Sequence, residues 1–530
     1  MTHPRAGLLS GPPAPRAGLG FVLAAYLALA TAFNARVPVF EAPDESTHFF
    51  FAQHLAFGGS LPVQPPDPDD RGPWEQEGSQ PPLYYAAVAP VVRLVGAPLA
   101  ADALWYNDQS TMGRPALVGN ENRFVHPSAA EGFPWHGYAL AVHLARIMST
   151  LLGLVTVVSV AVVARYAFPH RGWLWVAAAA AAGLNPQFLF VSAAVTNDAL
   201  LTALASLSVA LVLRLAHGHD DWATIWALAL AAGLAPLAKL SGLAVAAFVV
   251  ATVAALALAR RDWRLLVRVS VPLAVVLAAA DWWWYARNLR LYGDVTGIAR
   301  MLPGRTRRDF EAGPWLLGLP AELRGLWLST WGLFGWFTVL LPAPAYWAID
   351  VAAGIAVAGL VRVALEGPRW LRGRVAIWLT AWGGLVLASL LKWMTVAKGA
   401  QGRLLFGAIA TLATLLAAGW RGALPRRVPD GALAGGVTAA MAALALGSLR
   451  VVGTAYAPPA TVEASAIPAD AIAADVVFGP GLRLVAARYA PRVTEGQDLD
   501  VDLYWRADTQ LSADAFVALR VDQLVPNETA

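Results

Sequence analysis

The stretch "LGFVLAAYLALATAFNARVPVFEAPDESTHFFF" (residues 19 to 51) joins a long apolar run to two adjacent acids and a histidine. Runs of about 17 to 25 apolar residues are long enough to cross a bilayer. The segment before this run carries two arginines and no acid, which favours a cytoplasmic tail over residues 1 to 18. We therefore expect the first span to run outward and to bring Asp44, Glu45 and His48 to the outer surface of the membrane.

The composition supports this interpretation. With 58% hydrophobic residues, 14% charged residues and a mean hydropathy of +0.53, the chain is far more apolar than a soluble domain, in which about 25% of residues are charged. It predicts a multi-pass protein of the inner or plasma membrane. The net charge of +4 lies largely in short arginine clusters between apolar runs, which is typical of orientation signals and not of a nucleic-acid partner. The absence of cysteine excludes disulfides, thiolate metal sites and cysteine nucleophiles.

Eleven apolar runs are long enough to count as spans. They lie at residues 19–36, 138–164, 172–192, 198–215, 222–238, 240–259, 265–283, 345–365, 375–392, 403–419 and 431–450. The fold class that we predict is an all-α polytopic membrane protein with about 11 transmembrane helices over residues 19 to 453 and a small β-rich extracytoplasmic domain over residues 454 to 530. With the N-terminus in the cytoplasm, an odd number of spans places the C-terminal domain outside it.

A further apolar segment, "PLYYAAVAPVVRLVGAPL" (residues 82 to 99), contains Arg93 and has prolines at both ends. If this segment does not cross, the arginine clusters between the spans fall on the cytoplasmic side, as the positive-inside rule requires. These clusters are Arg165 and Arg171; Arg214; Arg260, Arg261, Arg264 and Arg268; Arg369, Arg372 and Arg374; and Arg421, Arg426 and Arg427. We therefore expect residues 82 to 99 to lie in the outer interface. The short gap at residues 239 to 241 predicts a tight corner between two spans.

The tail after the last span has the pattern of a small sheet. In "DLDVDLYW" (residues 498 to 505), apolar and polar residues alternate with a period of two, which indicates a half-buried strand. Residues 482 to 489 and 516 to 523 are expected to form neighbouring strands. Three strands are too few for a closed sandwich. We therefore expect a sandwich-like domain that is incomplete at residue 530 or rests on the membrane domain.

Two acids at the outer ends of spans are candidates for a functional site. Asp44 and His48 are four residues apart on an expected helix, so they share one face. Asp198 begins the span at residues 198 to 215, where a charge beside the hydrocarbon is costly and marks a functional candidate. Each acid also has a structural explanation as a helix N-cap, a position that Asp favours.

Basic residues on the outer side run against the positive-inside trend. Arg287 and Arg290 lie in "YARNLRLYGD", and Lys392, Lys398 and Arg403 lie in "LKWMTVAKGAQGRLLF". A phosphate would suit them, because arginine offers a bidentate fork and lysine a point charge. Contact with lipid headgroups at the outer surface is the alternative. The sequence has no paired histidine spacing for zinc, no Walker A loop and no glycine-rich dinucleotide fingerprint after a strand.

Seven motifs, taken in order, carry a resemblance to a known family. They are "APDESTHFF" (42–50), "QPPLYY" (80–85), "NPQFLFVSAAVTNDAL" (185–200), "KLSGL" (239–243), "RNLRLYGD" (287–294), "GLFGW" (332–336) and "QGRLLF" (401–406). The chain resembles the GT-C superfamily of multi-pass glycosyltransferases, which includes the dolichyl-phosphate-mannose-protein mannosyltransferases, and more closely a bacterial branch of it. The resemblance covers most of residues 20 to 420. The first loop departs from the family by carrying Asp-Glu in place of Asp-x-Asp.

The resemblance implies an inverting hexosyl- or pentosyltransferase that moves a sugar from a polyprenyl-phosphate donor to a glycan, lipid or protein acceptor on the outer face, among membrane lipids. Asp44 corresponds to the first-loop catalytic acid, expected to be the general base, and Asp198 to the second-loop acid. Glu45 is expected to assist them, and the three acids are the kind of ligands that Mg²⁺ or Mn²⁺ would take, although the Asp-Glu pattern leaves metal dependence open. Expected substrate-binding residues are His48, Gln80, Tyr84, Asn197, Lys239, Arg287, Asn288, Lys392, Lys398, Gln401 and Arg403. A transporter or scaffold for lipid-linked envelope glycans is the alternative function.

Overall fold

The computed structural model divides into two compact units, Met1–Tyr456 and Ala457–Ala530, close to the predicted boundary between residues 453 and 454. The structure describes residues 13–96, 98–107, 110, 121–302, 307–308, 310–366, 373–457, 461–478, 481–490, 492, 499 and 501–509. Each unit is described by itself.

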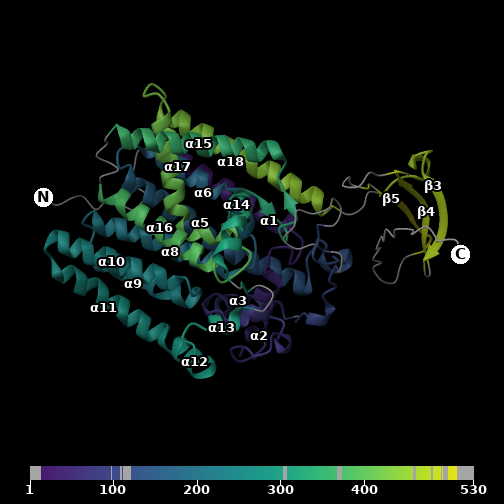
Figure 1. The fold of residues 1–530 in the computed structure, drawn as a ribbon, viewed down its shortest axis with the longest axis horizontal. Helices are drawn as coiled ribbons and strands as arrows, with labels where there is room; N and C mark the ends of the chain where they lie inside the picture. Colours follow the sequence, from purple (N-terminus) through teal and green to yellow (C-terminus); the bar gives the residue numbers. More distant parts are fainter. Residues whose placement is uncertain are drawn as a thin grey trace. The chain divides into compact units, whose positions relative to one another are not determined.

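The first unit is a bundle of apolar helices. Among its described residues, nine helical segments are long and apolar enough to cross a membrane. They are α1 (Pro13–Arg36), α5 (Gly137–Ala167), α8 (Asn197–Ala216), α10 (Gly242–Arg260), α11 (Trp263–Ala280), α15 (Ala343–Leu365), α16 (Arg374–Met394), η4 with α17 (Gly402–Ala408 and Ile409–Ala423) and α18 (Asp430–Ala455). Figure 1 shows α10 and α11 side by side with α9 (Trp222–Ala238), which is itself apolar but has only 17 residues. The prediction of a polytopic helical protein is confirmed.

The run at residues 172 to 192 is not one straight helix. It forms α6 (Gly172–Gly183) and α7 (Pro186–Ser192), which meet at an angle of 63°. Asn185 begins the second helix, because its side chain accepts a hydrogen bond from the amide of Phe188 at 3.0 Å and Pro186 occupies the first helical position. The eleven predicted runs therefore correspond to nine spans, this bent pair and the short α9.

The remaining helices lie between the spans. They are α2 (Glu45–Ala56), α3 (Leu83–Val95), α4 (Ser128–Glu131), α12 (Trp282–Tyr292), α13 (Ile298–Met301) and α14 (Ala312–Trp331), with short 3₁₀ turns η1 (Pro68–Asp70), η2 (Glu75–Ser79), η3 (Ala101–Ala103) and a hairpin of β1 (Leu333–Phe334) and β2 (Val339–Leu340). The expected interfacial segment is α3, which has 13 residues. A helix of that length spans about 20 Å, less than the roughly 30 Å of bilayer hydrocarbon. It packs against α2 and α5 instead.

Small residues let the helices approach closely, as is common in membrane bundles. A Cβ at Gly359 of α15 would lie 1.8 Å from the carbonyl oxygen of Gly419 in α17, so the two backbones touch there. The corner between α9 and α10 is equally tight, because a Cβ at Gly242 would lie 2.0 Å from the carbonyl oxygen of Ala235. The predicted tight corner at residues 239 to 241 is therefore confirmed.

The loops of the first unit gather at two ends of the bundle. At one end, the arginine-rich connections pair with each other's acids and carbonyls: Arg171 and Arg421 with Asp430, Arg268 with Asp220, and Arg260 with the carbonyls of Leu215 and Ala216. At the other end, Asp44 pairs with Arg403, and Asp198 pairs with Lys239. This separation agrees with the expected alternation of the spans. Which end faces the cytoplasm stays a prediction.

The second unit contains a three-stranded antiparallel sheet in the order β3 (Ile472–Phe478), β4 (Leu482–Tyr489) and β5 (Val501–Ala507). The predicted strand at residues 482 to 489 is confirmed as β4. The strand predicted at residues 498 to 505 is described from Val501, and β3 was not predicted. Residues 516 to 523 lie outside the described residues. Trp505 pairs with Leu484 across the sheet and contacts the ring of Phe478 at 5.3 Å between centroids.

Candidate active site

Asp44 stands at the start of α2 but does not cap it. Its backbone is left-handed, with φ of 64°, and its side chain makes no hydrogen bond to the first turn of the helix. A left-handed backbone costs an L-residue roughly 1 kcal/mol, and Asp is among the residues that tolerate it. The carboxylate instead accepts a hydrogen bond from Nε2 of Gln76 at 3.3 Å and pairs with Nη2 of Arg403. The geometry therefore does not support the capping explanation for Asp44.

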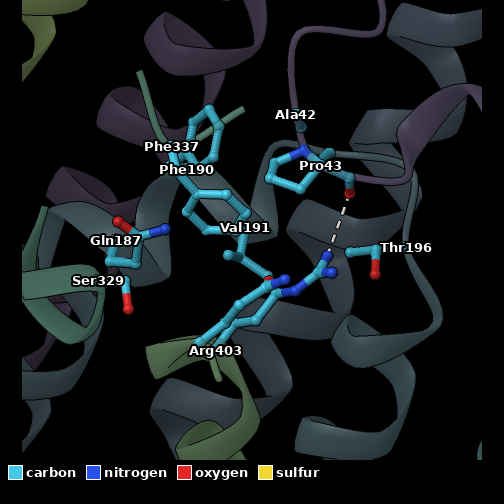
Figure 2. A pocket seen from close by; sticks show the side chains of 11 residues that line it. Ala42, Pro43, Gln187, Phe190, Val191, Thr196, Ser329, Phe337 and Arg403 are labelled. Atoms are coloured by element: carbon cyan, nitrogen blue, oxygen red, sulfur yellow. Dashed lines mark hydrogen bonds between the residues drawn. The ribbon is translucent and has the colours of Figure 1, made fainter. Parts of the chain in front are cut away.

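Arg403 connects the two candidate acids. It lies in η4, and its side chain is 11% exposed. One terminal nitrogen donates to the carbonyl of Pro43 at 3.1 Å, which is the bond drawn in Figure 2, and the other pairs with Asp44. Its Nε lies 3.6 Å from Oδ2 of Asp198. Residues that are hundreds of positions apart in sequence are thereby brought to one guanidinium group.

Asp198 lies in the first turn of α8, where Thr196 caps the helix by accepting the amide of Asp198 at 3.3 Å. The Asp198 carboxylate does not cap the helix and instead contacts Nζ of Lys239 at 2.5 Å. Its side chain is 6% exposed, so the charge needs a partner to be tolerated there. The site residues Asp44, Arg403, Asp198 and Lys239 thus alternate in sign, with two negative and two positive charges. We call these four residues the charge row.

A narrow pocket opens beside Arg403 (Figure 2). Apolar side chains of α7 and the β1–β2 loop form one part of it: Phe190, Val191 and Phe337. Polar groups are added by Gln187, Ser329 and Gln401, and the side-chain oxygen of Gln401 is buried without a hydrogen-bond partner among the described residues. The pocket therefore combines an apolar wall with a cation and polar groups at one edge.

Glu45 does not belong to this site, and its predicted catalytic role is corrected. Its side chain is fully buried and forms two bonds with Arg146, from Nε at 2.7 Å and from Nη2 at 2.6 Å. It also accepts the amides of Phe40 and Val195. Because every oxygen is engaged away from Asp44 and Asp198, Glu45 fixes the polypeptide around the site.

The expected metal set of Asp44, Glu45 and Asp198 is accordingly not assembled. In the part of the chain that the structure describes, no group of three His, Cys, Asp or Glu side chains is arranged to hold a metal ion. Asp44 and Asp198 face cations of the protein instead. The donor set therefore does not fit a resident divalent ion, and we derive no step through one.

Several other predicted residues lie next to the acids. Asn197 donates to Oε1 of Gln80 at 3.4 Å, and Gln80 in turn contacts the sulfur of Met301 at 3.7 Å. The Tyr84 hydroxyl accepts the amide of Thr196 at 3.0 Å and lies 2.8 Å from the Ser149 hydroxyl. Tyr84 is buried and holds the turn that presents Asn197, while its predicted contact with the substrate stays a prediction.

The structure does not bring the remaining predicted cations to the acids. Arg287 donates to the carbonyls of Leu61 and Pro62, at 3.1 and 2.7 Å, and so supports the first loop. Its neighbour Asn288 is buried and donates to the carbonyl of Val295 at 3.3 Å. Lys392 and Lys398 are exposed and make no recorded contact with the acids within the described ranges. Arg403 and Lys239 are therefore the cations of the site.

Glu77 is a buried acid that the sequence analysis missed. It lies in η2, and its Oε2 is 3.3 Å from the Tyr85 hydroxyl and 3.4 Å from Nδ1 of His48. Burial raises the pKa of Glu77 to about 8, and the negative charge of Asp44 adds to the rise. Burial also lowers the pKa of His48 to about 3. Although the distance would suit an ion pair, both groups are therefore neutral near pH 7. The sequence feature that could have indicated Glu77 is the acid-rich stretch "EQEGS", which comes directly before "QPPLYY".

No protein-family model and no curated protein matches the chain. Among solved structures, the crystal structure of ArnT from Cupriavidus metallidurans bound to undecaprenyl phosphate is similar over 83% of this chain and 76% of that chain, with 16% identity and a TM-score of 0.48. The apo structure of the same protein gives the same values. The protein O-mannosyltransferase Pmt1-Pmt2 complex of S. cerevisiae, bound to the sugar donor, is similar over 52% of this chain and 33% of that chain, with 18% identity and a TM-score of 0.32. Each similarity concerns the arrangement of the backbone.

Proposed function

We propose that the protein is a membrane glycosyltransferase that moves a sugar from a polyprenyl-phosphate donor to an acceptor on the extracytoplasmic face, with inversion and with Asp44 as the general base. One observation carries the proposal: the Asp44 side chain is turned away from its own helix and toward Arg403, a cation of a distant segment that also approaches Asp198. A carboxylate held in this way, at the end of a bundle of apolar helices, is suited to a reaction on a membrane-bound anion.

The charge row suits the binding of a phosphate. Arg403 and Lys239 offer a planar fork and a point charge, the two donor types that bind phosphate oxygens. A phosphate that takes hydrogen bonds from Arg403 competes directly with Asp44 for the same guanidinium. Donor binding would therefore release Asp44 from its partner and leave it able to accept a proton.

The chemical step follows from these positions. The acceptor hydroxyl attacks the anomeric carbon while its proton passes to Asp44, and the bond from that carbon to the phosphate oxygen breaks. The phosphate leaves with the electron pair, and Arg403 and Lys239 stabilise its charge by preorganised electrostatics. A general base of this kind contributes roughly 10² to 10⁴-fold to the rate.

The apolar side chains beside Arg403 favour a lipid-linked donor over a soluble nucleotide donor. Phe190, Val191 and Phe337 provide an apolar wall next to the cation that would bind the phosphate. Such a wall suits a hydrocarbon chain that begins at the phosphate.

The proposal is tested with Asp44→Asn in the purified full-length protein. Asn also tolerates the left-handed backbone, but it does not accept the proton. Transfer should fall by roughly 10²-fold or more, while binding of the donor should be retained or tightened because Arg403 loses its competitor. Thermal stability should change little.

Asp70→Asn, which changes an exposed acid in the same loop, is the matched control and should transfer at the wild-type rate. Undiminished transfer by Asp44→Asn would contradict the role of Asp44 as base. Binding of the donor without any transfer by the wild-type protein, across several acceptor classes, would favour a transporter or scaffold.

A further inference from the structure

Glu77 is a buried carboxyl group beside the charge row that the proposed reaction does not use. Its side chain is 6% exposed, and the two side chains that contact it, His48 and Tyr85, are also buried. The preceding residue, Gln76, donates to Asp44. The short turn η2 therefore carries both a direct contact to the base and a second acid.

The charge of Glu77 matters because the charge row around it is balanced. The groups that act on it are Asp44 and His48 from α2, Asp198 from α8, Lys239 after α9, Arg403 from η4 and Tyr85 from α3, with the exposed Glu75 on the same turn. When Glu77 is protonated, two carboxylates face two cations. When it is ionised, three carboxylates face the same two cations. An anionic phosphate therefore meets a neutral site in the first state and a negative one in the second.

The hydrogen bonds allow either state without leaving a buried group unpaired. A protonated Glu77 can donate to the Tyr85 oxygen, and the Tyr85 hydroxyl then donates to Nδ1 of His48, 2.8 Å away. When Glu77 is ionised, Tyr85 donates to the carboxylate and neutral His48 carries its proton on Nδ1. The cluster can thus gain or lose one proton while its bonding stays complete.

We propose that the phosphate of the donor binds the form of the site in which the Glu77 carboxyl carries its proton, and that this protonated carboxyl is what allows the balanced charge row to accept an anion. This inference rests on the proposed function, because it assumes a phosphate donor. The coupling is an acid–base equilibrium: at a pH where Glu77 is ionised, one proton from solvent must join its carboxylate as the phosphate enters. By reciprocity, the anion binds more tightly to the protonated state.

The test measures binding and not turnover. The probe is a polyprenyl methyl phosphodiester, whose single negative charge does not change over the pH range used. Its dissociation constant for the purified full-length protein is measured from about pH 6.5 to about pH 9.5. Affinity should fall as the pH rises through about 8. A unit charge close to the phosphate, at an effective dielectric constant of about 20, predicts a fall of roughly tenfold or more.

Glu77→Gln mimics the protonated acid and should bind the probe with the low-pH affinity of the wild type at every pH. Glu75→Gln, which changes the exposed acid two positions earlier, should keep the fall. If Glu77→Gln does not fold, Tyr85→Phe serves instead. It removes a donor to the carboxylate, so the midpoint of the fall should move to higher pH.

The inference is overturned if Glu77→Gln keeps the pH dependence, if it binds tenfold more weakly than the wild type at low pH, or if the wild type binds equally at all pH values. Failure of the wild type to bind the probe at any pH has a different meaning. It would overturn the proposed donor, and this inference with it.

Discussion

The buried pair of Glu45 and Arg146 allows a quantitative prediction about stability. Both side chains have zero exposure. Glu45→Gln keeps the size of the side chain but leaves the guanidinium charge of Arg146 uncompensated. Removing one partner of a buried ion pair costs about 3 to 5 kcal/mol, because the remaining charge stays away from water. We expect Glu45→Gln to lower the free energy of unfolding by about that amount.

Arg146 cannot escape this cost by turning outward. It also donates to the backbone carbonyls of Asn34, Val37 and Pro38, at 3.0, 2.7 and 2.8 Å. These bonds come from the end of α1 and the start of the first loop, so a movement of Arg146 would break three further hydrogen bonds. The charge therefore stays buried in the variant.

The assay is denaturant or thermal unfolding of the purified protein in one detergent. Glu366→Gln provides the matched control, because Glu366 pairs with Arg362 on the surface of α15 and both side chains are about half exposed, at 53% and 52%. That variant should be indistinguishable from the wild type, as exposed pairs contribute little. A loss below about 1 kcal/mol for Glu45→Gln would mean that the pair is not desolvated, and would refute the reasoning.

Three further predictions concern the remaining parts of the first unit. Lys239→Met should weaken binding of a polyprenyl phosphodiester, measured against wild type by direct binding to the folded fraction; unchanged affinity would remove Lys239 from the phosphate site. Burial opposes the charged form of His126, but hydrogen bonds to Glu131 and Glu41 outweigh it and raise its pKa to about 9. Its stabilising contribution should therefore be complete below about pH 6.5 and lost as the pH rises through about 9, and His126→Gln should remove that part of the unfolding profile. Reporter fusions after residues 120 and 460 should both report the extracytoplasmic side, and a cytoplasmic signal at residue 120 would reverse the orientation.

The spans could be predicted from sequence because a bilayer imposes one length on every crossing helix. The bend at Asn185 could not, because an apolar run has the same composition whether it is straight or broken. The information was local: Asn followed by Pro is a helix start, and Leu184 and Asn185 separate α6 from α7. Hydropathy is averaged over a window of many residues, so one Asn-Pro pair inside an apolar run hardly changes its value.

Part of the charge row could be predicted from the sequence. Asp44, Asp198 and Arg403 follow from alternation of the spans, which places their loops at one end of the bundle. Successive residues of a helix point about 100° apart, so an adjacent acid such as Glu45 need not share the direction of Asp44. Arg146 was overlooked because it lies inside an apolar span, where its partner in the first loop cannot be read from spacing.

The burial of Glu77 follows from tertiary packing, which explains both why the sequence did not reveal it and why it matters. A turn with the composition "EQEGS" reads as an exposed loop, and its first acid, Glu75, is indeed exposed. Glu77 lies two positions further on, where α2 and α3 cover it. A site whose two cations are already matched by Asp44 and Asp198 has no spare positive charge for an anionic donor. Binding must therefore either release a carboxylate from its partner or rely on the third carboxyl, that of Glu77, being protonated. Competition for Arg403 allows the release of Asp44. The buried cluster of Glu77, Tyr85 and His48 allows the Glu77 carboxyl to stay protonated.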